Sequence, residues 1–176
     1  YVGDIPRGLV VANGLKQRGR RLGADIFEQV RDRIPIDLVG MGAEGLAGLG
    51  EVHHSLLPGF EAHYRFFFHP VRYTSLGLAV CEAMMVGLPI IGLATTELVR
   101  VVENGVSGYI DTDIHSLMER MRELIADPAR ARCLGERARE FARSRLGMQR
   151  FVHDWNEVFE RVVTDQTQSS AFITHF

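Results

Sequence analysis

Residues 65–93 read RFFFHPVRYTSLGLAVCEAMMVGLPIIGL, and this segment gives the clearest indication of the fold. Three consecutive aromatic residues at positions 66–68 predict a strand with side chains on both faces of a sheet, and Pro70 ends it. Residues 77–86 predict a helix, and residues 89–93 predict the next strand. A strand, a helix and a strand joined by short connections are typical of a parallel sheet covered by helices.

The same alternation extends to both sides of this stretch. Short apolar runs predict further strands at residues 8–12, 36–39 and 108–110. Apolar stripes with helical spacing predict the remaining helices, at residues 24–33, 58–64, 97–103, 114–126, 129–146 and 148–163. We therefore expect an α/β fold: a Rossmann-like, doubly wound parallel sheet with helices on both faces and a helical C-terminal extension. One domain should span residues 1–163, and the tail at residues 164–176 shows no period and is expected to be disordered.

Composition and charge argue against several classes of protein. The 176 residues carry a net charge of −2, whereas domains with a nucleic-acid partner are usually strongly basic. The two cysteines, Cys81 and Cys133, do not suggest a secreted disulfide scaffold, and no apolar run reaches the roughly 18 residues of a membrane span. No pair of histidines or cysteines has the spacing of a metal site, so no bound metal is expected. Because the first residue is Tyr1 rather than methionine, we expect the chain to be part of a longer protein.

Glu82 is the most informative single residue. It is the only charged residue between positions 73 and 96, in a helix that is apolar on nearly every side. A carboxylate carried into such surroundings costs several kcal/mol unless something compensates it. Two interpretations remain open: an arginine elsewhere in the fold pairs with Glu82, or the hydroxyl groups of a ligand do.

The start of the same helix suggests what such a ligand would be. Helical side chains lean toward the helix N-terminus, so Glu82 should point toward the turn that contains Leu78. The amide groups of the first turn have no partner within the helix and form an anion site, and Gly77 lets a phosphate approach the backbone. A diphosphate on these amides, with Glu82 bound to a nearby sugar diol, is consistent with this arrangement.

Ligands of parallel α/β sheets bind beyond the carboxyl ends of the strands. The corresponding segments here are residues 13–14, 40–42, 69–74 and 94–96. A basic segment follows the first of them and contains Lys16, Arg18, Arg20 and Arg21. One or two of these cations would reach phosphates at the neighbouring helix N-terminus, whereas a solvated loop explains the others. Thr96 is expected to cap the helix that follows it.

Several spaced motifs together resemble a known family. The run TSLGLAVCEAMMVGLPIIG at residues 74–92 is followed by Glu97 and by ENGVSGYI at residues 103–110. This order resembles the carboxyl-terminal domain of family-4 (group 1) glycosyltransferases of the GT-B fold. The usual pattern there is Glu-x-Phe-Gly-Leu-x-x-x-Glu-Ala, then Gly-x-Pro-Val-Val, a glutamate and Asn-Gly-x-x-Gly. The resemblance covers roughly residues 8–163.

The resemblance implies roles for individual residues. Glu82 takes the place of the glutamate that binds the ribose of the donor nucleotide, and the amides of Gly77 and Leu78 would contact the donor's diphosphate or sugar. The phosphate-binding cations would come from the basic segment, with Arg18 ranked first, followed by Arg21 and Lys16.

One position departs from the family pattern. Thr74 stands where the family has a further glutamate, which contacts the transferred sugar. A threonine can donate and accept hydrogen bonds but carries no charge. This departure bears on the choice of sugar and on catalysis rather than on nucleotide binding. Thr74 and its neighbour Ser75 remain candidates for binding the nucleotide sugar.

The resemblance also implies an activity. It is the retaining transfer of a sugar from a nucleotide-diphosphate sugar to a glycan, a lipid-linked acceptor or a small molecule, with no obligatory metal or other cofactor. GT-B enzymes bind the acceptor in an amino-terminal domain, which this chain lacks, so the chain alone should bind donor without turnover. The alternatives are a non-catalytic nucleotide- or sugar-binding module and a GT-B nucleotide-sugar epimerase.

Expectations about partners follow from the same resemblance. The longer protein is expected in the cytoplasm, in polysaccharide biosynthesis, with peripheral contact to the inner face of the membrane. The arginines of residues 129–146 would suit anionic lipid, although a solvated face is the commoner explanation for such a run. The apolar face of residues 148–163 would pack toward the missing domain, and without that domain it favours a homodimer.

Overall fold

The computed structural model describes the backbone of residues 1–173 and the side chains of residues 1–164. These residues fall into two units, Tyr1–Ala142 and Arg143–Phe176. The first unit contains the sheet and the candidate site, and the second is helical.

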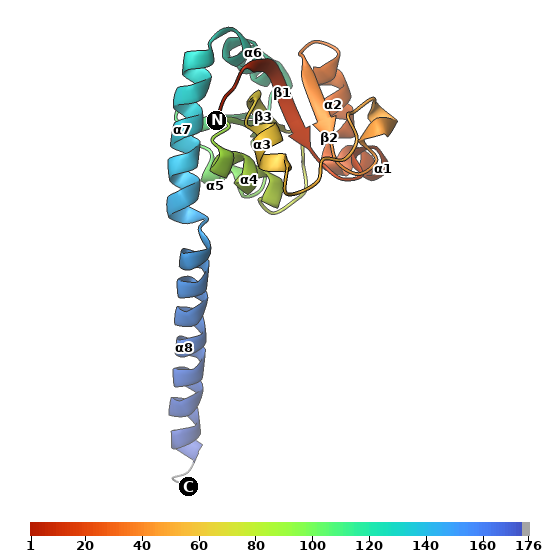
Figure 1. Cartoon of the computed structure of the whole chain (residues 1–176). Helices are drawn as coiled ribbons and strands as arrows, with labels where there is room; N and C mark the ends of the chain where they lie inside the picture. The colour runs from red at the N-terminus through yellow and green to blue at the C-terminus, as the bar shows by residue number, and fades with distance from the viewer. Residues whose placement is uncertain (174–176) are drawn as a thin grey trace. The chain divides into compact units, whose positions relative to one another are not determined.

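Five strands within the described residues form one parallel sheet in the order β2-β1-β3-β4-β5 (Figure 1). The strands are β1 (Ile5–Val11), β2 (Ile36–Val39), β3 (Tyr64–His69), β4 (Ile90–Leu93) and β5 (Gly108–Asp111). The chain places β2 on one side of β1 and then returns to place β3 on the other side. This reversal creates a switch point at the carboxyl ends of β1 and β3, where ligands of such sheets bind. The expected Rossmann-like α/β fold is confirmed.

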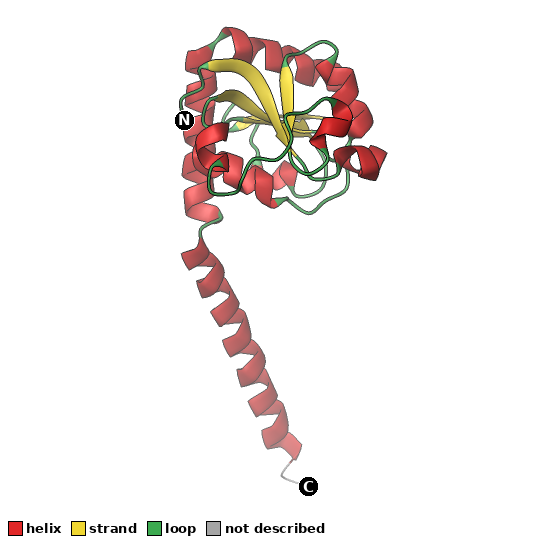
Figure 2. Cartoon of the chain, turned by 45° about the vertical axis from the view of Figure 1, so that its right-hand side comes forward, coloured by secondary structure: helices red, strands yellow, loops and turns green. Residues whose placement is uncertain are grey.

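Helices lie on both faces of the sheet (Figure 2). Before β3 come α1 (Leu15–Arg18), the 3-10 turn η1 (Gly19–Leu22), α2 (Ala24–Arg31), the 3-10 turn η2 (Ala43–Leu46) and α3 (Leu57–Glu61). After β3 come α4 (Leu78–Val86), α5 (Leu98–Val101), α6 (Ile114–Ala126) and α7 (Pro128–Arg145). The predicted apolar stripes are the buried faces: α2 buries Phe27 and Val30, and α6 buries Met121 and Leu124.

Strand β3 lies at the centre of the sheet and is buried along its whole length. Phe66, Phe67 and Phe68 are completely inaccessible to solvent. Because side chains alternate along a strand, these three rings fill the layers on both faces of the sheet. Truncating one of them to alanine would cost about 3–5 kcal/mol, so this run anchors both halves of the core.

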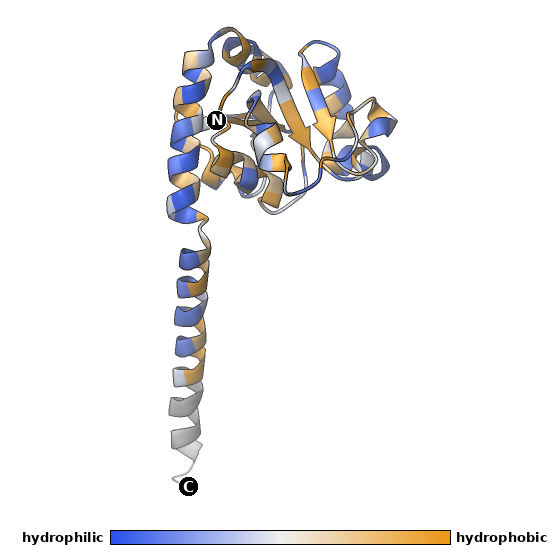
Figure 3. Cartoon of the chain, viewed as in Figure 1, coloured by the Kyte–Doolittle hydropathy of each residue, from blue (hydrophilic) through white to orange (hydrophobic). Residues whose placement is uncertain are grey.

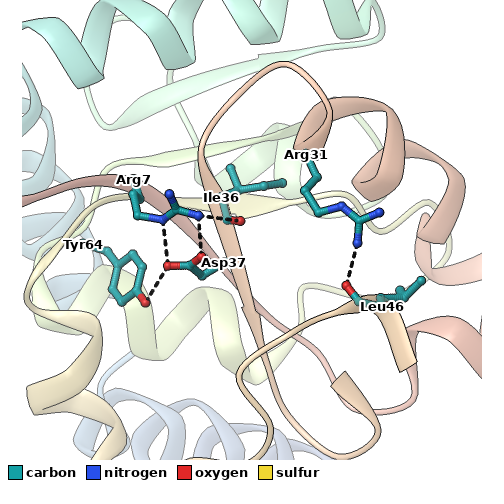
Figure 4. Close-up of polar contacts among 6 residues, drawn as sticks. All are labelled: Arg7, Arg31, Ile36, Asp37, Leu46 and Tyr64. Atoms are coloured by element: carbon teal, nitrogen blue, oxygen red, sulfur yellow. Dashed lines mark hydrogen bonds and ion pairs between the residues drawn. The ribbon is translucent and has the colours of Figure 1, made fainter. Parts of the chain in front are cut away.

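A polar network ties the first three strands together at their amino-terminal halves (Figure 4). Arg7 of β1 makes two hydrogen bonds to the Asp37 carboxylate of β2, at 2.9 and 2.7 Å, and the Tyr64 hydroxyl of β3 donates to the same carboxylate at 3.0 Å. Burial, together with the charge of Asp37, raises the pKa of Tyr64, so its hydroxyl remains a donor. Nearby, Arg31 of α2 donates to the carbonyl oxygen of Leu46 (Figure 4). The network leaves the opposite, carboxyl ends of these strands to the cavity described below.

One local expectation is wrong. Thr96 does not cap α5, because the residue that precedes this helix is Glu97. Thr96 instead adopts a positive φ of 49°, and its hydroxyl donates to the carbonyl oxygen of Ser75 at 2.9 Å. Thr96 therefore fastens the chain after β4 to the segment that leads into α4.

The second unit consists mainly of α8 (Met148–Ile173). The helix continues through Ile173, where the sequence suggested an irregular tail from residue 164, and residues 174–176 lie outside the described part. Apolar residues recur along one side of α8 (Figure 3). The exposed members of this stripe are Met148, Phe151, Val152, Trp155, Val158, Phe159 and Val162. No helix within the described residues is both long enough and apolar enough to cross a membrane.

Candidate functional site

A cavity of about 760 Å³ opens at the carboxyl ends of β1, β2 and β3, beside the start of α4. This is the edge at which the strand order reverses, as expected for a ligand site. Its lining includes Val11, Asn13, Arg18, Gly40, Glu51, Val52, His53, His54, Leu57, His69, Thr74, Gly77, Leu78, Ala79 and Glu82. Residues from several segments, far apart in the sequence, therefore meet around one space.

The start of α4 forms one wall of the cavity. Gly77, immediately before the helix, has a φ of 89°, a conformation that favours glycine. A Cβ atom at this position would meet only the His69 ring, at 3.8 Å, so little protein stands in front of the backbone. The amide of Val80 donates to the carbonyl oxygen of Gly77 at 3.2 Å, whereas the amides of Leu78 and Ala79 have no acceptor within the helix. The amides of Leu78 and Ala79 are therefore available to an anion in the cavity.

Glu82 lies one turn further along α4 and also lines the cavity. Its side chain is half-buried, and within the described residues it makes no hydrogen bond or ion pair. The sequence left open whether an arginine pairs with Glu82, and no arginine does so among the described side chains. An acidic group that points into a cavity and has no protein partner favours the ligand interpretation of Glu82.

Only one cation of the basic segment reaches the cavity. Arg18, the last residue of α1, is the single lysine or arginine in the lining, judged over the described side chains. Lys16 and Arg21 are exposed and lie outside it, and Lys16 extends beside Gly45. Ser75 is likewise outside the lining, whereas Thr74 belongs to it. The structure thus places Arg18 and Thr74 in the lining of the cavity that the start of α4 also lines, and leaves Lys16, Arg21 and Ser75 outside it.

Close backbone contact holds the basic segment in this position. A Cβ atom on Gly23 would lie 2.0 Å from the carbonyl oxygen of Pro70, so only glycine allows the segment to approach the end of β3. Arg72 reinforces the contact, since it donates to the carboxylate of Asp25 and to the carbonyl oxygen of Arg20, the latter at 2.8 Å. This ion pair lowers the pKa of Asp25.

Sequence reasoning named some lining residues only indirectly. Asn13, Gly40 and His69 fall at the strand ends that it marked as ligand segments. Asn13 also joins two of these segments, because its side-chain oxygen accepts a hydrogen bond from the Met41 amide at 2.9 Å. Burial lowers the pKa of His69 to about 4, so this imidazole is neutral at physiological pH.

His53 and His54 are residues that sequence reasoning missed. As an adjacent pair they lack the spacing of a metal site, and no group of three metal-binding side chains occurs within the described residues. Both line the cavity from the chain that leads into α3. No sequence signal identifies them, because an irregular segment has no period from which its position could be predicted.

The chain was compared with known proteins. Residues 49–141, just over half of the chain, match the family model described as glycosyl transferases group 1. The chain belongs to this family. The matched range includes Gly77 and Glu82, and glycosyl transfer is the chemistry of the family. The expected resemblance to the carboxyl-terminal domain of a group 1 glycosyltransferase is confirmed.

One curated relative is the N-acetyl-alpha-D-glucosaminyl L-malate synthase of Bacillus anthracis. It is 29% identical over 93 residues, which is 52% of this chain and 24% of the relative. The alignment therefore spans about a quarter of the relative's length.

Solved structures share the fold. Sucrose-phosphate synthase from Thermosynechococcus elongatus superposes with a TM-score of 0.77 at 22% identity, covering 92% of this chain and 46% of that one. HepE from Anabaena, in complex with UDP, gives 0.71 at 16%, covering 90% and 49%. The C-terminal domain of the group 1 protein LpcC from Francisella tularensis gives 0.62 at 11%, covering 84% and 88%. At these identities the likeness concerns the fold alone.

Proposed function

We propose that this chain is the donor-binding domain of a retaining glycosyltransferase and binds a nucleotide-diphosphate sugar in the cavity at the start of α4. One observation carries the proposal: Glu82, which has no hydrogen-bond or ion-pair partner among the described side chains, shares a cavity with the first amides of α4 and with Arg18. A group that accepts hydrogen bonds next to a group that attracts anions suits a ribose followed by a diphosphate. The structure of HepE with UDP-glucose supports a uridine nucleotide as the first ligand to test.

Each residue has a defined task in this proposal. The Glu82 carboxylate accepts hydrogen bonds from the ribose hydroxyl groups. The amides that follow Gly77, together with the guanidinium of Arg18, bind the diphosphate. As the bond to the sugar breaks, negative charge grows on the departing diphosphate, and these donors stabilise it without reorganising. No metal or other cofactor is part of the proposal.

The longer protein would supply the domain that binds the acceptor. The curated relative is about four times as long as its aligned region, and the acceptor is proposed to bind an amino-terminal domain that faces this cavity. The chain alone would then bind donor without transferring sugar. A location in the cytoplasm at the inner face of the membrane, a role in polysaccharide biosynthesis, and a glycan, lipid-linked or small-molecule acceptor belong to the same proposal and rest on the family alone.

Thr74 favours a second candidate function. It lines the cavity where the family pattern has a glutamate that contacts the transferred sugar. A site that keeps Glu82 but lacks this charge would suit a non-catalytic nucleotide- or sugar-binding module. Turnover by the longer protein, measured as release of free nucleotide from its donor, distinguishes the two functions.

The proposal is tested by calorimetric titration of the chain with UDP, GDP, ADP and CMP. We expect one nucleoside diphosphate to bind selectively. The variant Glu82→Ala should weaken this binding by about 1.5–3 kcal/mol, the usual value for a hydrogen bond to a charged group. Glu28→Ala, which removes an exposed glutamate of α2, is the matched control and should bind as the parent does. A folded chain that binds none of the four would contradict the proposal, as would a Glu82→Ala variant of unchanged affinity.

A further inference from the structure

Glu61, the last residue of α3, carries a carboxyl group that the proposed donor contacts do not use. Its side chain is completely buried, and neither carboxyl oxygen has a hydrogen-bond partner within the described residues. An ionised carboxyl group in this condition costs several kcal/mol, and most buried polar groups do have a partner. The position therefore calls for a functional explanation.

Glu61 and Glu82 belong to two helices, α3 and α4, that pack against each other. Leu57 lines the cavity, and Glu61 follows it by four residues, so both lie on one face of α3. Leu78 and Glu82 have the same spacing on α4, and both line the cavity. Helix α3 packs against α4 (Figure 1). Glu61 is therefore buried one turn along α3 from the cavity lining, and the charge of Glu82 on α4 is near enough to act on it.

The surroundings keep Glu61 protonated at neutral pH. Burial, with the nearby charge of Glu82 adding to it, raises the pKa of Glu61 to about 8. The titratable and charged groups on the neighbouring segments are Cys81, Glu82, His53, His54, His63, Tyr64, Arg65 and His69. Among these, Glu82 is the charge that adds to burial in raising the pKa of Glu61. Arg65 is occupied by the carbonyl oxygens of Gly3, Leu124 and Ile125.

We propose that Glu61 is a positioning residue for the donor: its protonated carboxyl group donates a hydrogen bond to the Glu82 carboxylate and orients it toward the ribose. The inference rests on the proposed donor-binding function. The two carboxyl groups make no hydrogen bond to each other in this structure, and the proposal assigns the bond to the donor-bound state. A protonated carboxyl group can donate, whereas an ionised one can only accept. Ionised Glu61 would also place a second negative charge beside Glu82.

The inference predicts a specific dependence of donor affinity on pH. Wild-type affinity for UDP should fall as the pH rises past about 8, because Glu61 then loses the proton that it donates. Glu61→Gln retains a donor at every pH, so it should bind within about threefold of wild type at pH 7 and lack this fall. Glu61→Met retains the size but has no donor, so it should bind about tenfold more weakly at pH 7. UDP itself also titrates in this range, and its titration contributes to the pH dependence of the affinity. The same contribution is present in the Glu61→Gln series, so the difference between the two series isolates the effect of Glu61.

The experiment is an NMR titration of the chain with UDP, or with whichever of GDP, ADP and CMP binds in its place, between pH 6.5 and 9. It uses wild type, the two Glu61 variants, Glu82→Ala, and the double variant Glu61→Met/Glu82→Ala. In the Glu82→Ala background, Glu61→Met should cause no further loss. In the wild type, saturating nucleotide should raise the pKa of the Glu61 carboxyl group by about one unit, the counterpart of a tenfold change in affinity.

The outcomes separate this inference from the proposed function. If no nucleotide binds wild type, both fail together. If Glu82→Ala weakens binding but Glu61→Met binds like wild type, only the role of Glu61 is overturned. Equal losses from Glu61→Met with and without Glu82 would also overturn it, because Glu61 would then act through packing alone. Circular dichroism verifies the fold of each variant, and the Gln and Met side chains are close to Glu in size.

Discussion

The buried residue Glu61 makes the free energy of unfolding depend on pH. In the unfolded chain its pKa is near 4.5, whereas in the folded chain it is about 8. Between these values the folded chain holds a proton that the unfolded chain has released. The free energy of unfolding therefore falls as pH rises through this window, and the stabilisation that is complete below pH 4.5 is lost above pH 8.

We predict that Glu61→Gln flattens this dependence. Wild type should lose on the order of 4 kcal/mol of unfolding free energy between pH 4.5 and 8.5 through this group, and the variant should not. Urea denaturation across this range measures the difference. Glu28→Gln, on the exposed face of α2, controls for the loss of a carboxyl group. Parallel curves for Glu61→Gln and wild type would show that Glu61 is already ionised in the folded chain.

At the scale of elements, short helices decide which side chains reach the cavity. Residues 13–23 form α1 and η1, and this winding directs Arg18 to the cavity while Lys16 and Arg21 remain outside. The approach of Gly23 to Pro70 fixes the segment against β3. A basic loop thus contributes one cation to the candidate site, and its other cations face solvent.

This difference yields a paired test within the basic segment. Arg18→Ala should weaken UDP binding about tenfold, because it removes a charged donor to the diphosphate. Arg20→Ala removes an equal charge two residues away, outside the cavity lining, and should change affinity less than twofold. Calorimetry at one fixed ionic strength compares them. Equal losses would indicate general electrostatic attraction rather than a contact made by Arg18.

The helix α4 combines two properties that the site needs. It is buried through Val80, Ala83 and Met84, which fix its position against the sheet. Its first turn remains open to the cavity, and Leu78 is 80% exposed. The apolar composition that places the helix in the core also leaves Glu82 as its single charge.

At the scale of the whole molecule, stability and binding occupy opposite ends of the strands. The Asp37 network joins β1, β2 and β3 toward their amino ends, and the cavity lies at their carboxyl ends. Substitutions around the cavity therefore leave the main polar network of these strands intact. This separation makes binding variants such as Glu82→Ala compatible with a folded chain.

From the exposed apolar stripe on α8 we predict that the isolated chain associates with itself. The stripe on α8 exposes Phe151, Trp155 and Phe159 to water, at 58%, 47% and 57% of their surface. Burying such area stabilises an association by about 25 cal/mol per Å² before the entropy cost of association. We expect a concentration-dependent homodimer in sedimentation experiments. Trp155→Glu should shift it toward monomer, and His153→Glu, at an exposed position on the opposite face of α8, should not. A monomer at all concentrations would contradict this expectation.

The sequence alone determined the class of fold and the most informative part of the candidate site. Period and composition suffice for this because a buried strand such as β3, or a helix such as α4, shows its burial directly in its apolar residues. The motif around Gly77 and Glu82 is likewise local, so both residues could be named before the structure. The family resemblance ranked Arg18 ahead of Arg21 and Lys16, but only the winding of the short glycine-rich segment decides that Arg18 alone of the three lines the cavity.

Tertiary structure alone decided which distant residues meet. Glu61 and Glu82 are 21 positions apart and belong to different helices, and only the packing of α3 on α4 makes one carboxyl group raise the pKa of the other. The same holds for His53 and His54, which reach the cavity from an irregular segment. The physical reason is that local sequence encodes the burial of each element, whereas desolvation and charge coupling depend on neighbours that packing brings together.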